Sequence, residues 1–143
     1  MTGRRHPSGF TLIELMIIVA IVAILTLIAV PKFGTLIRRA NEAGTKGHLG
    51  SVRGAIRLYY MEMDQVYPLS FAGLRQAGSK FLTGSTPMYT GVHPVSDIVD
   101  DVPAKDASVD AGHWAYVSGG SDMGYFWAQC THLDLSDKPW SSY

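Results

Sequence analysis

The order of apolar and polar positions divides the chain into a continuous apolar run, an amphipathic stretch and a mixed C-terminal part. From Leu12 to Val30 only Glu14 and Thr26 are polar. A helix of that length measures about 28 Å, which is enough to cross the hydrocarbon core of a bilayer. The run therefore predicts one membrane-spanning helix near the N-terminus.

Helical periodicity continues beyond this run to about residue 64. On a helical wheel of residues 36–63, one face is apolar, which predicts that it packs against a globular domain. Its members are Leu49, Val52, Ile56, Tyr59, Tyr60 and Met63. A basic stripe comprises Arg39, Lys46, Arg53 and Arg57, and a small-residue face comprises Ala40, Ala43, Gly44, Gly47, Gly50, Ser51 and Gly54.

Each of the two remaining faces has two interpretations. The basic stripe is either a solvated surface or a charged contact with another subunit. The small-residue face either loosens the helix, since each glycine destabilises it by about 1 kcal/mol relative to alanine, or admits a second backbone at close range. We favour the second interpretation of the small-residue face.

The C-terminal part predicts a small sheet after a loop-rich segment. The sequence Val66-Tyr67-Pro68 ends the helix, and a short helix is expected at residues 69–77. Aromatic-rich runs at 113–117 and 125–130 flank a glycine-containing segment, which is typical of a hairpin. The predicted fold is α+β: a long N-terminal helix, transmembrane in its first half, packed on a small antiparallel β-sheet.

The charge is unevenly distributed although the formal net charge is zero. Residues 1–80 hold ten of the twelve Lys and Arg and four of the twelve Asp and Glu; the remainder holds two and eight. A net charge of zero argues against nucleic acid as a partner. The asymmetry favours charge complementarity between subunits.

Candidate metal ligands are few, and we expect no catalytic site. The single cysteine, Cys130, cannot form an internal disulfide, and its alternation with Phe126 and Ala128 predicts a buried, inert thiol. Cys130, His132 and Asp134 would share one face of a strand, but one short run lacks the separated ligands of a zinc site. We therefore expect no cofactor and no enzyme activity. Calcium stays an unassigned alternative, with candidate ligands at Asp122, Asp134 and Asp137.

The apolar run has two ordinary explanations, and neither is complete. A secretory signal peptide would be shorter, and residues 29–32 make a poor cleavage site. A plain signal anchor fits, because Arg4 and Arg5 would hold the N-terminus in the cytoplasm. It does not explain Glu14, since a carboxylate within a membrane helix costs roughly 2.5–3.5 kcal/mol without a partner.

The sequence Gly9-Phe10-Thr11-Leu12-Ile13-Glu14-Leu15 resembles the cleavage and methylation motif of type IV prepilins and type II secretion pseudopilins. A basic leader precedes it, and Pro31 follows where the family also has a proline. The resemblance implies cleavage after Gly9 by a prepilin peptidase and N-methylation of Phe10. It also implies that Glu14 neutralises the Phe10 amine of a neighbouring subunit, and that the helix loosens before Pro31 during assembly.

This resemblance implies four regions: a leader at 1–9, a transmembrane and polymerisation helix at 10–31, an amphipathic helix half at 32–65 and a globular head at 66–143. It implies a structural subunit that polymerises with itself and with other pilin-like subunits, driven by an inner-membrane platform protein and an assembly ATPase. The subunit would span the bacterial inner membrane once, with a cytoplasmic N-terminus and a periplasmic head, before joining a periplasmic or extracellular filament.

Within the family we favour a type II secretion-like pseudopilus. The absence of a disulfide, the small head and a C-terminal resemblance to short pseudopilins support this choice. A major or minor type IV pilin, serving adhesion, motility or DNA uptake, is one alternative. A single-pass membrane-anchored binding domain that does not polymerise is an alternative of another class.

Overall fold

The computed structural model of the chain describes residues 9–76 and 80–143. Most of the predicted leader, residues 1–8, and the end of the predicted short helix, Ala77, lie outside the described residues. The chain divides into two compact units with the boundary after Ile37. Helix α1 contributes residues to both units.

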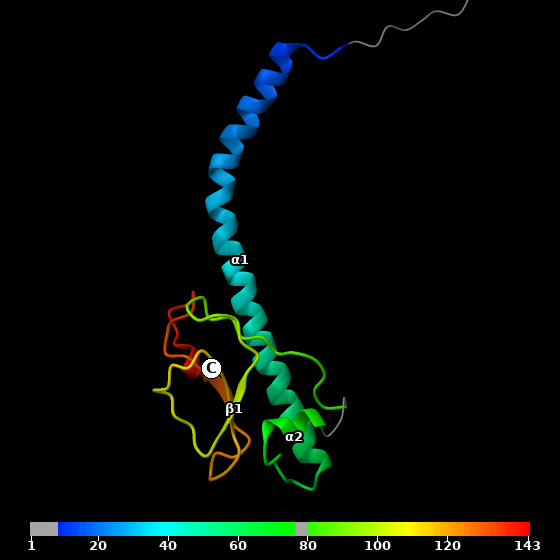
Figure 1. The fold of residues 1–143 in the computed structure, drawn as a ribbon, viewed down its shortest axis with the longest axis vertical. Helices are drawn as coiled ribbons and strands as arrows, with labels where there is room; N and C mark the ends of the chain where they lie inside the picture. The colour runs from blue at the N-terminus through cyan, green and yellow to red at the C-terminus, as the bar shows by residue number, and fades with distance from the viewer. Residues whose placement is uncertain (1–8, 77–79) are drawn as a thin grey trace, which may run out of the picture. The chain divides into compact units, whose positions relative to one another are not determined.

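Helix α1 extends over Leu12–Glu62 and confirms the long predicted helix (Figure 1). It continues through Pro31 in the single chain, and the loosening before Pro31 that the resemblance implies concerns the assembled filament. A proline removes only one backbone hydrogen-bond donor, and the helical turns on either side of it keep their own hydrogen bonds. The helix ends where Asp64 and Gln65 adopt positive φ angles and the Gln65 amide bonds the Tyr60 carbonyl at 2.9 Å. This is the 6→1 bond of a Schellman-type helix end.

In the unit beginning at Arg38, a three-stranded sheet has the order β1-β2-β3. The strands are β1 (Val99–Val102), β2 (His113–Val117) and β3 (Phe126–Gln129), and a short helix α2 occupies Phe71–Gln76. The predicted antiparallel hairpin is confirmed, with Ala115 opposite Trp127. Strand β1 was not predicted. It pairs in parallel with β2, so the sheet is mixed and not purely antiparallel.

The core lies between the sheet and the second half of α1, as the apolar helix face predicted. Leu49, Val52 and Ile56 are buried together with aromatic side chains of β2 and β3. Two polar groups of the core aromatics have backbone partners: Trp114 Nε1 donates to Thr86 O and Tyr116 OH donates to Pro68 O. Nε1 of Trp127 and Nε1 of Trp140 are buried without a hydrogen-bond partner among residues 9–76 and 80–143. The predicted face is shorter than expected, because Met63 at its end is exposed.

The last ten residues also pack on this unit. They end in a single 3₁₀ turn, η1 (Trp140–Ser142), whose Trp140 is almost fully buried in the core. In Figure 1 the sheet and the C-terminus lie beside the second half of α1. The tail is therefore part of the folded head.

Candidate functional site

The predicted cleavage site lies just before α1. Gly9 and Phe10 have no helical structure and both are exposed, and an atom added at the Cβ position of Gly9 would have no neighbour within 4 Å. A peptidase must bind its substrate in an accessible, non-helical conformation. The bond between Gly9 and Phe10 meets both conditions in this structure.

Glu14, the predicted assembly residue, is held by Thr11. Its Oε2 accepts hydrogen bonds from the Thr11 amide at 2.8 Å and the Thr11 hydroxyl at 2.7 Å, while the Glu14 amide approaches Thr11 Oγ1 at 3.3 Å. This is a capping box, in which Thr11 is the N-cap of α1 and Glu14 is the third helical residue. Thr11 was not among the predicted site residues, although the spacing Thr-x-x-Glu is a readable signal for it.

The apolar segment of α1 has the properties of a membrane anchor. By length and composition α1 contains a stretch able to cross a bilayer, none of which is buried within the protein. Its one polar side chain besides Glu14 is satisfied locally, because Thr26 Oγ1 donates to the Val22 carbonyl at 2.7 Å. Exposed apolar side chains over this length require a lipid or protein environment.

The basic stripe is partly used inside the head. Lys46 Nζ donates to Asp134 Oδ2 and to the Tyr143 hydroxyl, and Arg53 donates to the carbonyls of Phe126 and Tyr143 at 2.9 and 2.6 Å. Arg57 is exposed. The stripe is therefore neither wholly solvated nor reserved for contacts with other subunits. Lys46 and Arg53 bind within the folded unit, and Arg57 is exposed.

These contacts hold the tail of the chain against α1. Asp134 is buried, and its Oδ1 also accepts the amides of Ser136 and Lys138. Burial alone would raise the pKa of Asp134, but the hydrogen bonds from Lys46, Tyr143 and these amides outweigh it and hold the pKa below its usual range. One turn before Lys46 in α1, the carboxylate of the buried Glu42 accepts a hydrogen bond from the Leu135 amide at 3.0 Å.

The small-residue face of α1 is open. All seven of its residues are exposed, and a Cβ added at Gly44, Gly47, Gly50 or Gly54 would meet nothing within 4 Å. No packing inside the described chain, residues 9–76 and 80–143, accounts for these glycines. The face is therefore available to another molecule.

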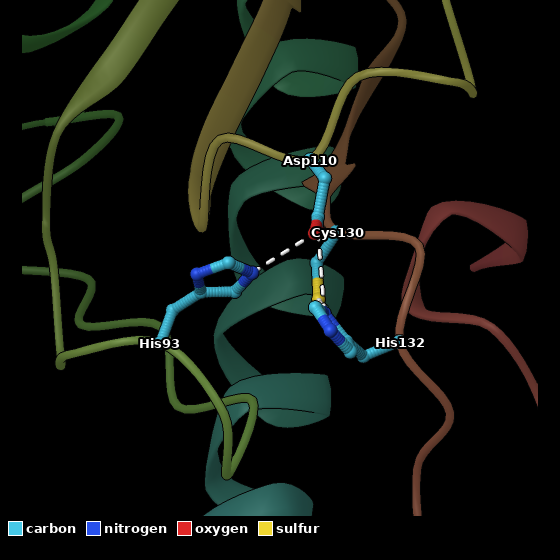
Figure 2. Close-up of side chains that lie close together, drawn as sticks. All are labelled: His93, Asp110, Cys130 and His132. Atoms are coloured by element: carbon cyan, nitrogen blue, oxygen red, sulfur yellow. Dashed lines mark hydrogen bonds and ion pairs between the residues drawn. The ribbon is translucent and has the colours of Figure 1, made fainter.

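A cluster of four side chains gathers near the end of the sheet where β2 begins and β3 ends: His93, Asp110, Cys130 and His132 (Figure 2). Cys130 is buried, as predicted, and burial raises the pKa of its thiol. His132 also belongs to the cluster, but the third residue of the predicted run, Asp134, pairs with Lys46 instead. His93 and Asp110 were not among the predicted metal-ligating residues, because they lie in loops far from Cys130 in the chain.

The carboxylates of the three aspartates considered for calcium are not gathered into one group within the described part of the chain. Asp134 has the partners given above, and Asp137 lies in the following turn with a φ of 58°. Neither carboxylate converges with that of Asp122, and the only group of three or more metal-ligating side chains among residues 9–76 and 80–143 is the His93 cluster.

Comparison with known proteins places these features in a family. The family model "Prokaryotic N-terminal methylation motif" matches residues 4–30. The chain is 34% identical over 117 residues to the type IV wide pilus major component PilA4 of Thermus thermophilus, covering 82% of this chain and 79% of that protein. No solved structure matches the chain.

Shorter matches include both branches of the family. The chain is 35% identical over 71 residues to the type II secretion system core protein G of Pseudomonas aeruginosa, covering 50% of this chain and 49% of that protein. It is 42% identical over 65 residues to the type IV major pilin protein PilA of Myxococcus xanthus, covering 44% and 30%. The chain thus spans half or less of the length of these two relatives.

Three observations agree: the motif at residues 4–30, the long helix packed on a small sheet, and the extended match to a pilus component. These relatives are named as pilus or secretion-system components, and none of the three is named for a catalytic activity. The chain therefore belongs to the type IV pilin and pseudopilin family, as a membrane-anchored structural subunit.

Proposed function

We propose that this chain is a filament subunit that is cut after Gly9, N-methylated at Phe10 and assembled into a type II secretion-like pseudopilus. The observation that carries the processing step is the geometry of the Gly9–Phe10 bond, which is exposed and lies outside α1 directly before its N-cap. A prepilin peptidase would cut it on the cytoplasmic side, where the positive-inside rule puts Arg4 and Arg5. The head would then lie in the periplasm.

Assembly in this proposal uses the charge of Glu14. Cleavage creates an amine on Phe10, and a carboxylate paired with an amine in a low-dielectric environment is far less costly than a lone one. The capping box supports this role, because two hydrogen bonds from Thr11 already orient the carboxylate at the start of the helix. Thr11 offers the Glu14 carboxylate only neutral hydrogen-bond donors. The incoming amine of a neighbouring subunit would add a positive charge opposite it.

The partners in assembly are other copies of this chain and other pilin-like subunits, with an inner-membrane platform protein and an assembly ATPase. The exposed apolar side chains of residues 12–37 and the open small-residue face support a helix-to-helix contact in the filament. The filament is periplasmic in the pseudopilus and extracellular in a pilus.

A type IV pilus subunit is the second candidate function. It is favoured by the extent of the match to the wide pilus component of Thermus thermophilus, which covers 79% of that protein against 49% for the secretion-system core protein. The head without an internal disulfide and the match to the core protein favour the pseudopilus.

Mass spectrometry of the protein from its native membrane tests the processing. We expect a chain that begins at methylated Phe10, and a precursor that accumulates at full length when Gly9 is replaced by leucine. Assembled protein that retains Met1 contradicts the proposal. Deletion of the gene then separates the two branches: loss of exported proteins from the medium supports the pseudopilus, whereas loss of surface filaments with normal secretion supports the pilus.

A further inference from the structure

The side chains of His93, Asp110, Cys130 and His132 direct one ligand atom each toward a common point. All four ligand atoms lie within 4.8 Å of one another. In Figure 2 both imidazole rings turn a nitrogen toward the carboxylate of Asp110, and the thiol of Cys130 lies close to His132. The four residues come from three separate segments: the loop before β1, the loop before β2 and the segment after β3.

Three of the six separations among the ligand atoms are close to the edges of a metal tetrahedron. His93 Nε2 lies 3.0 Å from Asp110 Oδ1, His132 Nδ1 lies 3.3 Å from the same oxygen, and Cys130 Sγ lies 3.6 Å from His132 Nδ1. With zinc–nitrogen distances of about 2.0–2.1 Å and a zinc–sulfur distance of about 2.3 Å, the edges of a tetrahedral site measure about 3.3–3.7 Å. The other three separations are at most 4.8 Å, so placing all four atoms on one cation requires some of them to approach by up to about 1 Å.

The arrangement does not suit a catalytic relay. In a nucleophile–histidine–acid relay, the nucleophile and the acid bind opposite nitrogens of the imidazole. Here Cys130 Sγ and Asp110 Oδ1 both approach Nδ1 of His132. The thiol is also fully buried, with 0% of its residue surface exposed. Convergence on one point is the geometry of ligands.

The donor set selects the kind of metal. Two imidazoles, one thiolate and one carboxylate suit zinc, whereas calcium takes oxygen ligands. The charges also balance, since a divalent cation would neutralise the thiolate of Cys130 and the carboxylate of Asp110 while both histidines stay neutral. A coordinating thiol is deprotonated by the metal itself.

The surrounding backbone supports the position of two ligands. The Thr131 amide donates to Asp110 Oδ1 at 3.0 Å, which orients the carboxylate. Gly112 has a φ of 75°, and a Cβ added there would lie 2.5 Å from Cγ of His93. Only glycine leaves room for the His93 ring in this place.

From this geometry we infer that His93, Asp110, Cys130 and His132 form a structural zinc site. The metal would link the three segments that connect and follow the strands. A small exported domain commonly depends on disulfides for such links, and this chain has only one cysteine. Zinc takes the place of a covalent cross-link in the head.

The test uses the full-length chain, purified in detergent with a tag that contains no histidine. Zinc is titrated against a chromophoric chelator, and cobalt is then bound in its place. We expect about one zinc per chain, the visible absorption of tetrahedral cobalt and a thiolate-to-cobalt charge-transfer band. In Cys130→Ser this band disappears. In His93→Gln the zinc affinity falls more than 100-fold, since losing a ligand exceeds the roughly 10–100-fold effect of losing a ligand's support.

His113→Gln is the matched control. His113 also pairs with an aspartate, Asp100, and its side chain is exposed to a similar extent, 21% against 22% for His93. This variant should bind zinc as the unmodified chain does. Two results overturn the inference: an unmodified chain that binds no zinc in the chelator competition, which leaves only a hydrogen-bonded cluster, or His93→Gln and His113→Gln chains with equal zinc affinity. The first measurement needs no variant and is therefore independent of any effect of a substitution on folding.

Discussion

The ammonium group of Lys46 donates a hydrogen bond to the carboxylate of Asp134, 88 residues later in the chain, and the Tyr143 hydroxyl bonds the same oxygen. The ion pair is partly buried: the Asp134 side chain is buried, and a third of the Lys46 side chain is exposed. It joins the middle of α1 to the tail.

Replacing Asp134 with asparagine should lower the free energy of unfolding by about 2 kcal/mol, since hydrogen bonds to charged groups contribute roughly 1.5–3 kcal/mol. Denaturation followed by tryptophan fluorescence measures this in the full chain, because all three tryptophans are buried in the head. Asp137→Asn is the control, since Asp137 is exposed. Equal unfolding midpoints for the two variants contradict the role of the pair.

The same pair predicts an acid dependence. The pKa of Asp134 is lower in the folded head than its usual value, so the folded state binds fewer protons there. Its contribution to stability is complete above the unfolded pKa of about 3.9 and is lost as the pH falls through the lowered folded pKa. The stability difference between the unmodified chain and Asp134→Asn should therefore be constant from pH 5 to 7, on the order of the figure above, and shrink below about pH 4.

Variants at Glu14 separate its two roles. Glu14→Gln keeps a hydrogen-bond acceptor for Thr11 but removes the charge, whereas Thr11→Val keeps the charge and removes the hydroxyl contact. We expect both chains to insert and to be processed. Filament yield should fall severely with Glu14→Gln and only slightly with Thr11→Val. Should Glu14→Gln assemble normally, the carboxylate acts as a helix cap and not as the partner of an amine.

The small-residue face predicts a steric effect on assembly alone. Gly47→Leu with Gly50→Leu should leave the head folded, because an added Cβ meets nothing at either position, and should stabilise α1 by about 1 kcal/mol per site. Filament assembly should be lost if another helix packs there. Normal filaments from this double variant, checked by electron microscopy, show that the face is simply solvated.

The basic stripe predicts different results for neighbouring arginines. Arg53→Ala should destabilise the head, because Arg53 binds two backbone carbonyls. Arg57→Ala should leave the unfolding transition unchanged, since this side chain is exposed. If Arg57 forms charged contacts between subunits, Arg57→Glu should weaken filaments in a salt-dependent manner. Parallel losses of head stability in the Arg53 and Arg57 variants contradict this division of the stripe.

Sequence patterns predicted those parts of the fold that depend on local periodicity. The apolar run, the helix face from Leu49 to Ile56 and the hairpin were all readable because burial repeats at fixed spacing within one element. Strand β1 was missed because Val99–Val102 is half acidic, and its pairing with β2 is parallel and not made through a turn.

Among the candidate sites, too, the residues of contiguous motifs could be predicted, and those brought together only by folding could not. Gly9, Phe10 and Glu14 could be proposed from the sequence because their motif is contiguous. Cys130 and His132 were considered together with Asp134, but this run was rejected as a metal site because it lacks separated ligands. His93 and Asp110 approach them only after two loops have folded, and no spacing in the sequence encodes that approach. Tyr143, which binds both Lys46 and Arg53, was missed for the same reason.

The contacts between α1 and the tail also affect the order of folding. Glu42, Lys46 and Arg53 leave the ribosome early, and their partners at residues 134–143 are synthesised 88 to 93 residues later. Contacts between residues so far apart in sequence form slowly, because the intervening chain must lose entropy before they contribute. The head therefore cannot close around its core until synthesis has passed Trp140. Until then, the apolar face of α1 lacks a lasting intramolecular partner, which leaves the unfinished subunit open to aggregation and proteolysis.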